Sequence, residues 1–224
     1  EIPIEVSRVT ETLEKAGFEA FLVGGCVRDL LMDRKPKDWD VTTNAKPDQI
    51  IGLFEKTMYE NTFGTVGVYV SRETSLSSVS QETSEYLVVE VTPYRLEAKY
   101  TDFRHPDEVK FSDDLKDDLK RRDFTINAIA LSSKGHLVDL FDSIKDIESK
   151  TIRAVGDSDE RLNEDALRML RAVRFACQLD FSVSYETTKS IVKNSDLIKN
   201  ISQERIRDEL EKIIMSPNPT TGVA

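Results

Sequence analysis

The sequence lacks several features that mark common protein classes. It has only two cysteines and two histidines in 224 residues, which are too few for a disulfide framework or a histidine-rich metal site. It has no run of about 18 apolar residues, so we expect no membrane span and no membrane partner. Residues 1–17 are amphipathic and acidic, unlike a secretory signal peptide, which has a basic segment before an apolar one. These absences predict a cytoplasmic protein.

A surplus of positive charge is also missing. The chain has 31 Lys and Arg against 41 Asp and Glu, a formal net charge of −10. This balance argues against electrostatic capture of a polyanion by the whole surface. If nucleic acid is the partner, the basic surface is local or lies in sequence beyond this chain. The two cysteines, Cys26 and Cys177, stand in apolar contexts far apart, which predicts buried free thiols.

Two kinds of apolar pattern divide the chain. Period-two alternation predicts strands, and spacings of three and four predict helices. We expect strands over 21–23, 58–63, 65–70 and 86–94, a hairpin over 129–140, and helices over 4–16, 27–32 and from Pro47. Beyond residue 155 only helices are expected, over 163–175, 185–193 and 201–214. The pattern predicts an α+β fold, with a mixed-sheet domain at 1–155 and an all-α domain at 156–224.

One stretch near the N-terminus carries the strongest chemical signal. An apolar run breaks at Gly24-Gly25, a short helix-like segment contains Arg28, and Asp38-Trp39-Asp40 follows. We interpret this order as strand, glycine turn, helix, turn and strand. Alternate residues of a strand share a face, so Asp38 and Asp40 are expected to project together while Trp39 faces the core.

Adjacent carboxylates repel each other unless a cation lies between them. Oxygen ligands of this kind suit Mg²⁺, with phosphate oxygens completing its coordination. Gly24 and Gly25 allow a ligand close to the backbone, and Arg28 adds a positive charge. A lone Gly-Gly is usually a turn, and a lone Asp-x-Asp is usually a solvated strand end. Their combination with Arg28 predicts a nucleotide site.

Glu90 interrupts the apolar run over 86–94. A carboxylate in the middle of a buried strand is costly unless it is paired or binds a metal. Two interpretations stay open: an ion pair with Arg95 or another arginine, and a third catalytic carboxylate beside Asp38 and Asp40. The polar, aperiodic segment 71–84 is expected to be a loop.

Two further segments concentrate charge. Arg121-Arg122-Asp123 opens a run that continues to Asn127 and Ala128, and arginine suits phosphate recognition. The alternative is a surface salt-bridge cluster with Asp117 and Asp118. Later, charged residues recur at every third position of a predicted helix, at Asp165, Arg168, Arg171 and Arg174. Such a stripe is usually a solvated ion-pair ladder, yet Asp165 and Arg168 together offer the acceptor and the donor that reading a base edge requires.

These motifs, in this order, resemble those of the class II tRNA nucleotidyltransferase and poly(A) polymerase family. The resemblance rests on Gly24-Gly25-x2-Arg28-Asp29 with Asp38-x-Asp40, on the segment 121–128, and on Glu164-Asp165-x2-Arg168-x2-Arg171. It spans nearly the whole chain. It implies a polymerase-β-type nucleotidyltransferase head at 1–155 and a helical neck at 156–224. It also implies that RNA-binding body and tail domains are absent, consistent with a chain that stops soon after Pro217-Asn218-Pro219.

The resemblance implies a role for each motif residue. Asp38 and Asp40 would bind Mg²⁺, and Gly24, Gly25, Arg28 and Arg122 would hold the nucleotide, with its triphosphate at the glycine turn. Asp165 and Arg168 would pair with the base edge, so that protein replaces a nucleic acid template. The remaining motif residues would support the nucleotide or lie near its ribose: Arg171, Arg174, Asp123 and Asn127.

The implied function is Mg-dependent transfer of CMP and AMP from CTP and ATP to the 3′ end of tRNA, that is, CCA addition or repair. Alternatives within the class are a poly(A) polymerase, which uses ATP alone, and a partial A-adding or CC-adding enzyme. The loop at 71–84 weakens the CC-adding alternative, because that subtype tends to have a shortened loop. Outside the class, the alternative is a non-catalytic nucleotide-binding module.

Overall fold

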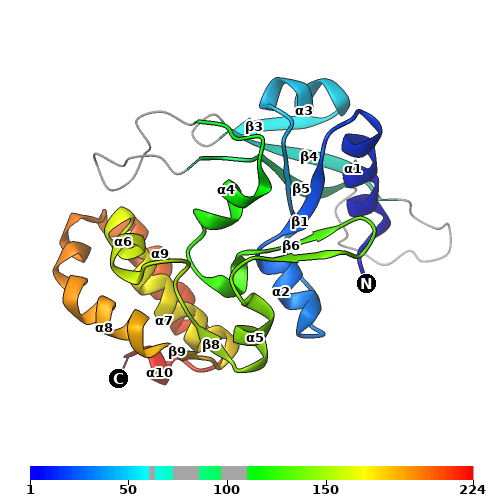
Figure 1. The fold of residues 1–224 in the computed structure, drawn as a ribbon. Helices are drawn as coiled ribbons and strands as arrows, with labels where there is room; N and C mark the ends of the chain where they lie inside the picture. The colour runs from blue at the N-terminus through cyan, green and yellow to red at the C-terminus, as the bar shows by residue number, and fades with distance from the viewer. Residues whose placement is uncertain (61–63, 73–85, 97–109, 224) are drawn as a thin grey trace. The chain divides into compact units, whose positions relative to one another are not determined.

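The computed structural model describes residues 1–60, 64–72, 86–96 and 110–223, and the predicted loop at 71–84 lies almost wholly outside this part. The chain forms two compact units. The first comprises Glu1–Leu96, Phe111–Asp117 and Ala130–Val138, and the second contains 118–129 and the C-terminal helices (Figure 1). In the described part, no helix is long and apolar enough to cross a membrane. The predicted division into functional domains at residue 155 stays a prediction.

A seven-stranded sheet, ordered β3-β4-β5-β2-β1-β6-β7, organises the first unit. Its strands are β1 (Ala20–Val23), β2 (Asp40–Thr43), β3 (Thr57–Glu60), β4 (Thr65–Ser71), β5 (Tyr86–Pro93), β6 (Ile129–Ser132) and β7 (Leu137–Asp139). β2 pairs with β5 in parallel, whereas β1–β2, β1–β6, β3–β4 and β4–β5 are antiparallel. The sheet is therefore mixed, as the sequence predicted.

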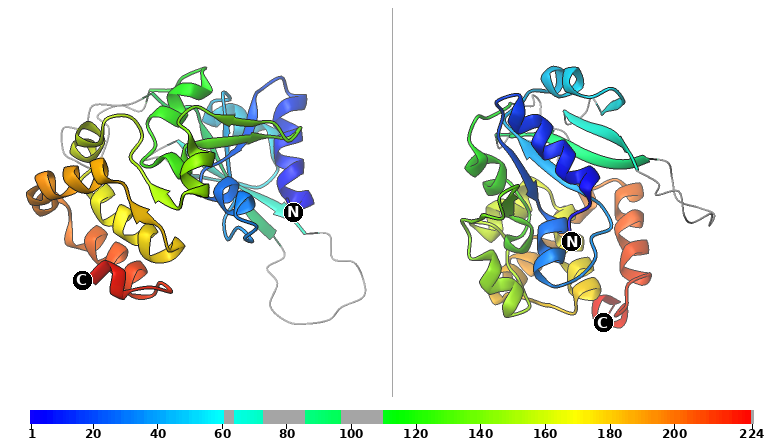
Figure 2. Two further views of the ribbon diagram at one scale, coloured as in Figure 1. Left: turned by 60° about the horizontal axis from the view of Figure 1, so that its bottom comes forward. Right: turned by 90° about the vertical axis from the view of Figure 1, so that its right-hand side faces the viewer.

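Helices α1 (Ile4–Lys15) and α3 (Pro47–Leu53) contact β4 and β5 and bury one face of the sheet. Figure 2 shows α1, in dark blue, lying against the strands. Val6, Val9 and Leu13 of α1 are fully buried, because the helical repeat places them on one side. α1 ends at Lys15, and Gly17, just beyond the C-cap Ala16, has a φ of 89° that favours glycine. α3 begins at Pro47, as predicted, because proline lacks only an N–H that the first turn leaves unpaired.

The opposite face of the sheet is open on β5. Val89 and Val91 are fully buried, whereas Val88 and Glu90 are exposed. This alternation is the period of two expected of a strand with one face in the core. The interpretation of Glu90 as a buried carboxylate was therefore wrong, because its side chain lies on the exposed face.

The second unit contains most of the remaining elements. They are α4 (Leu115–Lys120), which begins in the first unit, η1 (Thr125–Asn127), α5 (Ser143–Glu148), β8 (Thr151–Ile152), α6 (Ser158–Glu164), α7 (Leu167–Leu179), β9 (Ser182–Val183), α8 (Tyr185–Asn194), η2 (Ser195–Asn200), α9 (Gln203–Ile214) and α10 (Thr220–Val223). α7 packs against α9 and α10, and α6 packs against α8. The core of these helices includes Leu162, Ala166, Leu167, Met169 and Ile201.

The structure corrects one predicted helix. The sequence favoured a continuous helix over 163–175, but Asp165 is extended, with φ of −145° and ψ of 103°, and separates α6 from α7. The short elements β9 and α10 are among those that the sequence did not predict. β9 pairs in parallel with β8, and α10 packs so closely on α7 that a Cβ atom on Gly222 would lie 2.6 Å from the sulfur of Cys177.

Candidate active site

The glycine turn forms the start of α2 (Gly25–Leu31). Gly24 caps this helix with φ of 79° and ψ of −135°, a conformation that is essentially restricted to glycine. Arg28 is buried and folds back over the turn, so that a Cβ atom on Gly25 would lie 3.6 Å from its Nη2 atom. Asp29 holds Arg28 there, accepting from Nη2 at 2.7 Å and from Nε at 2.9 Å. A fixed positive charge therefore lies beside the predicted phosphate turn.

Asp38 and Asp40 do not both lie on a strand. β2 begins at Asp40, and Asp38 lies in the bend before it. The expected alternation nevertheless holds, because Trp39 and Val41 are buried, Asp40 is half-buried and Asp38 is exposed. The prediction that Trp39 faces the core is confirmed.

Cys26 connects the glycine turn to Asp40. Its thiol lies 3.3 Å from the Val23 carbonyl oxygen and 3.8 Å from that of Asp40. Burial raises the pKa of the Cys26 thiol to about 11, and the nearby negative charge of Asp40 contributes to the increase. The end of β1, the first turn of α2 and the start of β2 thus meet around one small side chain.

Glu90 is the register partner of Asp40 across the parallel pair β2–β5. Side chains at paired positions project from the same face of a sheet. Asp40 and Glu90 therefore share the open face. Within the described residues, no three His, Cys, Asp or Glu side chains are grouped closely enough to hold a metal ion. A third metal-binding carboxylate at Glu90 stays a prediction.

In the second unit, Arg121 and Arg122 both bind Asp118. The carboxylate accepts from Arg121 Nη2 at 2.6 Å and from Arg122 Nη2 at 2.9 Å. Asp118 is fully buried. Burial alone would raise its pKa, but the charges of Arg122 and Arg121 lower the pKa to about 2. The predicted cluster with Asp118 is real, but it is not a surface cluster. Arg122 also has a buried Nε–H without a hydrogen-bond acceptor within the described chain.

Asp123 is bound by Arg171 and Asn127. One carboxylate oxygen accepts from Arg171 Nε at 2.8 Å and Nη2 at 2.6 Å, and the other accepts from Asn127 Nδ2 at 3.2 Å. Burial alone would raise the pKa of Asp123, but Arg171 holds it well below its ordinary value. Asp123 thereby fixes the middle arginine of α7 to the segment after α4.

Asp165 and Arg168 do not pair with each other. One Asp165 oxygen accepts from the N–H of Leu167, the first residue of α7, at 3.0 Å, and the other accepts from Arg205 Nη2 at 2.8 Å. Arg168 donates from Nη1 to Glu164 at 2.5 Å and from Nη2 to the Arg121 carbonyl oxygen at 3.2 Å. Both side chains are held at the break between α6 and α7.

Arg174 donates to Glu209 of α9 at 2.9 Å, and both side chains are buried. Its guanidinium also lies 4.5 Å from the ring centroid of Phe175. The three arginines of α7 thus bind α6, Asp123 and α9 instead of forming a solvated ladder. Sequence reasoning missed Arg205 and Glu209. Their signal was a spacing of four on a predicted helix, which places both on one side.

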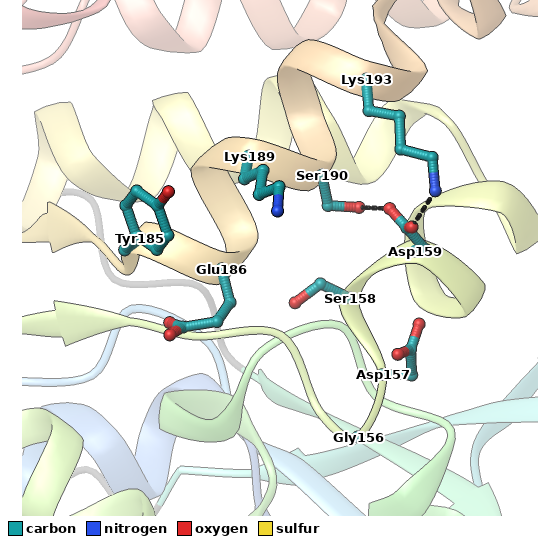
Figure 3. Close-up of a pocket in the computed structure, with 9 residues that line it drawn as sticks. All are labelled: Gly156, Asp157, Ser158, Asp159, Tyr185, Glu186, Lys189, Ser190 and Lys193. Carbon is teal, nitrogen blue, oxygen red and sulfur yellow. Dashed lines mark hydrogen bonds and ion pairs between the residues drawn. The ribbon is translucent and has the colours of Figure 1, made fainter.

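A pocket of about 410 Å³ lies elsewhere in the second unit, between α6 and α8 (Figure 3). None of the predicted site residues lines it. Its polar groups bind one another, since Asp159 accepts from both Ser190 and Lys193. The hydrogen bond from Lys193 is the main cause that lowers the pKa of Asp159 to about 2. The polar groups of the pocket therefore serve the contact between α6 and α8.

Comparisons with known proteins agree with the predicted motifs. Residues 20–153 match the model of the poly A polymerase head domain, and residues 180–224 match that of the probable RNA and SrmB-binding site of polymerase A. The CCA-adding enzyme of Lactobacillus helveticus is 46% identical over 216 residues, which cover 96% of this chain and 51% of that enzyme. That of Enterococcus faecalis is 46% identical over 220 residues, covering 98% and 51%.

Among solved structures, the CCA-adding enzyme of Bacillus stearothermophilus in complex with CTP superimposes with a TM-score of 0.85 at 36% identity. The match covers 98% of this chain and 50% of that one. The predicted fold class, a mixed-sheet nucleotidyltransferase head followed by helices, is confirmed by this similarity. The chain spans about half the length of the curated relatives that it matches.

Proposed function

Because the chain belongs to the poly(A) polymerase head-domain family, we propose that it transfers CMP and AMP from CTP and ATP to the 3′ end of tRNA. Two relatives named CCA-adding enzymes are 46% identical to it, and the similar structure from Bacillus stearothermophilus is a complex with CTP. The proposed reaction needs no template strand. It places the protein among cytoplasmic tRNA-processing enzymes, with residues 1–155 as catalytic head and residues 156–224 as neck.

The observation that carries the proposal is the position of Asp40. It is half-buried at the start of β2, its carbonyl oxygen lies 3.8 Å from the Cys26 thiol in the first turn of α2, and it is in register with Glu90. Asp40 therefore presents a carboxylate at the open face of the sheet, next to the glycine turn. A carboxylate beside a phosphate-binding turn is what the proposed attack on a triphosphate would use.

Oxygen donors of this kind fit Mg²⁺, and we assign Asp38 and Asp40 as the residues that would hold it. The metal would activate the RNA 3′-hydroxyl and neutralise the departing pyrophosphate. The chain itself has to position the nucleotide and balance its charge, since these effects dominate phosphoryl-type transfer. Asp40 is preorganised for this role because β1 and β5 hold the backbone of β2 on both sides.

Both units contain residues that the resemblance assigns to the nucleotide. In the first, Gly24, Gly25 and Arg28 form the proposed triphosphate turn, where Arg28 is already oriented by Asp29. In the second, Arg122 has a buried Nε–H that has no acceptor in the described chain. A phosphate oxygen could accept from this N–H. Such a bond would remove the cost of a buried unpaired donor, about 1–3 kcal/mol.

We assign base recognition to Asp165 and Arg168. Cytosine and adenine each carry an exocyclic amino group that a carboxylate accepts from, and uracil lacks it. Arg205 holds the Asp165 carboxylate, and Glu164 holds the Arg168 guanidinium. Arg171 and Arg174 of α7 would support the nucleotide, and Asp123 and Asn127 would lie near its ribose.

Poly(A) addition is the second candidate, because the matching family model is described by that activity. The two share their chemistry and differ in the product. A non-catalytic nucleotide-binding module is a weaker candidate, since its expected signature is the loss of an aspartate or of Arg122, and all are present.

The deciding experiment measures incorporation of labelled CTP and ATP on tRNA that lacks its terminal CCA. It uses this chain and a longer chain that also contains the half of the relatives' length that this chain does not cover. We expect three nucleotides in the order C, C and A. A long run of A would favour the polymerase. Binding of CTP without any incorporation by either chain would contradict the enzymatic proposal.

A further inference from the structure

The open face of the sheet continues away from Asp40 and Glu90 across three strands. Gly67 of β4 is the register partner of Glu90, and Tyr69 is the partner of Val88. On the next strand, Met58 of β3 pairs with Gly67. Because paired positions share a face, Met58, Tyr69 and Val88 lie on the same side of the sheet as Glu90.

This part of the face is apolar and exposed. The side chains of Met58 and Val88 are 59% and 42% exposed, whereas Val66, Val89 and Val91 on the opposite face are fully buried. Contiguous apolar patches on an exposed surface mark binding sites, and Met58 and Val88 are contiguous because both lie beside Gly67. Tyr69 lies among them, with its hydroxyl 3.8 Å from the Met58 sulfur.

A cation and two aromatic rings complete the surface. The Lys56 ammonium lies 3.7 Å from the ring centroid of Tyr86 and 5.3 Å from that of Tyr69. The two rings are 6.4 Å apart in an edge-to-face arrangement. Aromatic faces next to a basic side chain are the usual means of binding single-stranded nucleic acid, because bases stack on the rings and the cation attracts the phosphates.

Gly67 leaves a gap in this surface directly beside Glu90. A Cβ atom added there would lie 3.6 Å from both the Met58 carbonyl oxygen and Val88 Cγ1, which is ordinary van der Waals contact. The backbone of Gly67 does not require glycine, since its φ lies outside the positive region. At Gly67, therefore, no side chain covers the path along the face from the aromatic residues to the carboxylates.

We propose that this surface, which we call the sheet platform, binds the unpaired 3′ end of the RNA whose terminal hydroxyl is extended at Asp40. The platform comprises Lys56, Met58, Tyr69, Tyr86 and Val88. This inference rests on the proposed function and adds the course of the RNA strand. The platform is continuous with the row formed by Gly67, Glu90 and Asp40.

The dimensions fit a short single strand. β3 and β2 are separated by three strand spacings, about 14 Å at about 4.8 Å each. Stacked nucleotides rise by about 3.4 Å, so the face accommodates about four of them. The platform offers rings and a thioether to the bases and one ammonium to the phosphates, and this composition suits stacking that tolerates any base. Such tolerance suits a strand whose last nucleotides change at each addition.

The test compares the KM for RNA with the KM for CTP in the full chain. The single variant Lys56→Gln removes the cation. The double variant Tyr69→Leu, Tyr86→Leu removes the two rings. Tyr59→Leu is the matched control, because Tyr59 is 43% exposed but projects from the opposite face of β3. We expect the KM for RNA, and the Kd for a single-stranded RNA ending in CC, to rise about tenfold or more. The KM for CTP should stay unchanged in these variants. The control Tyr59→Leu should leave the KM for RNA and the KM for CTP unchanged.

Gly67→Val gives a second test that does not remove any contact. Valine favours strands and has room at Cβ, so the melting temperature should not fall, while its methyl groups should block the path and weaken RNA binding. Unchanged RNA binding in all these variants of an active enzyme would overturn the platform and leave the proposed function standing. If the wild type is a dimer and these variants are monomers, the face is a protein–protein interface. That result would also overturn the platform. If the wild-type protein incorporates no nucleotide, the result would instead contradict the proposed function itself.

Discussion

The Arg205 guanidinium lies 2.8 Å from the Asp165 carboxylate, across 40 residues of sequence. Asp165 is extended between α6 and α7, where its other oxygen accepts from the N–H of Leu167, the first residue of α7. Four residues along α9, Glu209 binds Arg174 of α7. One side of α9 therefore holds two residues that the proposed function assigns to the nucleotide.

Loss of Arg205 should reduce nucleotide discrimination. Arg205→Gln leaves the Asp165 carboxylate without its cation, so its orientation toward an amino group on the base is no longer fixed. We expect the ratio of kcat/KM for CTP to that for UTP to fall about tenfold or more. Arg207→Gln is the matched control, because Arg207 is exposed on the same helix. Equal ratios in both variants would remove Arg205 from base recognition.

Breaking the buried pair of Arg174 and Glu209 should destabilise the second unit. Glu209→Ala leaves the Arg174 charge buried without its carboxylate, which costs about 3–5 kcal/mol in such pairs. Urea unfolding measures this loss. The double variant Arg174→Met, Glu209→Leu should recover most of it, since no buried charge remains. Lys199→Ala, in an exposed pair with Asp196, should change stability by less than about 1 kcal/mol.

Stability should fall in acid as Asp118 is protonated. Its pKa is about 2 in the folded protein, below the ordinary value of 3.8, because of Arg122 and Arg121. A lowered pKa contributes stability that is fully present above about pH 4 and is lost as the pH falls toward 2. A shift of this size corresponds to about 2 kcal/mol. Unfolding free energies between pH 6 and 2 measure it.

Asp118→Asn should remove this part of the acid dependence and lower stability at pH 6. Asp113→Asn serves as the matched control, because Asp113 is exposed two residues before α4. If wild type and Asp118→Asn lose stability in parallel as the pH falls, the assignment to Asp118 is wrong.

Asp40→Ala should abolish incorporation of labelled CMP while preserving the fold. The substitution removes the carboxylate at the start of β2, on the open face of the sheet. We expect the incorporation rate to fall by more than about 10²-fold. Circular dichroism checks the fold, and a CTP titration checks the remaining nucleotide site. Asp48→Ala, at an exposed carboxylate in the first turn of α3, should behave like wild type. Turnover near the wild-type rate would refute the role of Asp40.

Sequence reasoning succeeded where the signal was local. Gly17 follows the end of α1 and Pro47 begins α3, because backbone conformation at these positions depends on the residue itself. The alternation around Trp39 and Val41 predicted which side chains face the core. The three ordered motifs predicted the family that the matching model confirms.

The errors arose where distant residues decide. Residues 163–175 favour a helix throughout, but Asp165 breaks it because its carboxylate binds both the Leu167 N–H and Arg205. Glu90 interrupts a β-branched run and was interpreted as buried, but only the sheet shows that its face is open. The arginines of α7 have the spacing of a surface ladder, yet their partners lie on other segments, with Arg174 buried and the other two half-buried.

The sequence alone determined which chemistry this protein carries: neighbouring acidic residues after a glycine turn, and arginines in ordered motifs, mark a family by residue type and spacing. The tertiary structure decided how those groups are used, because the free energy of a buried charge depends on its partners, and these come from segments far along the chain. Asp118, Asp123 and Glu209 hold arginines in place, and the register of β2 and β5 sets Asp40 beside Glu90.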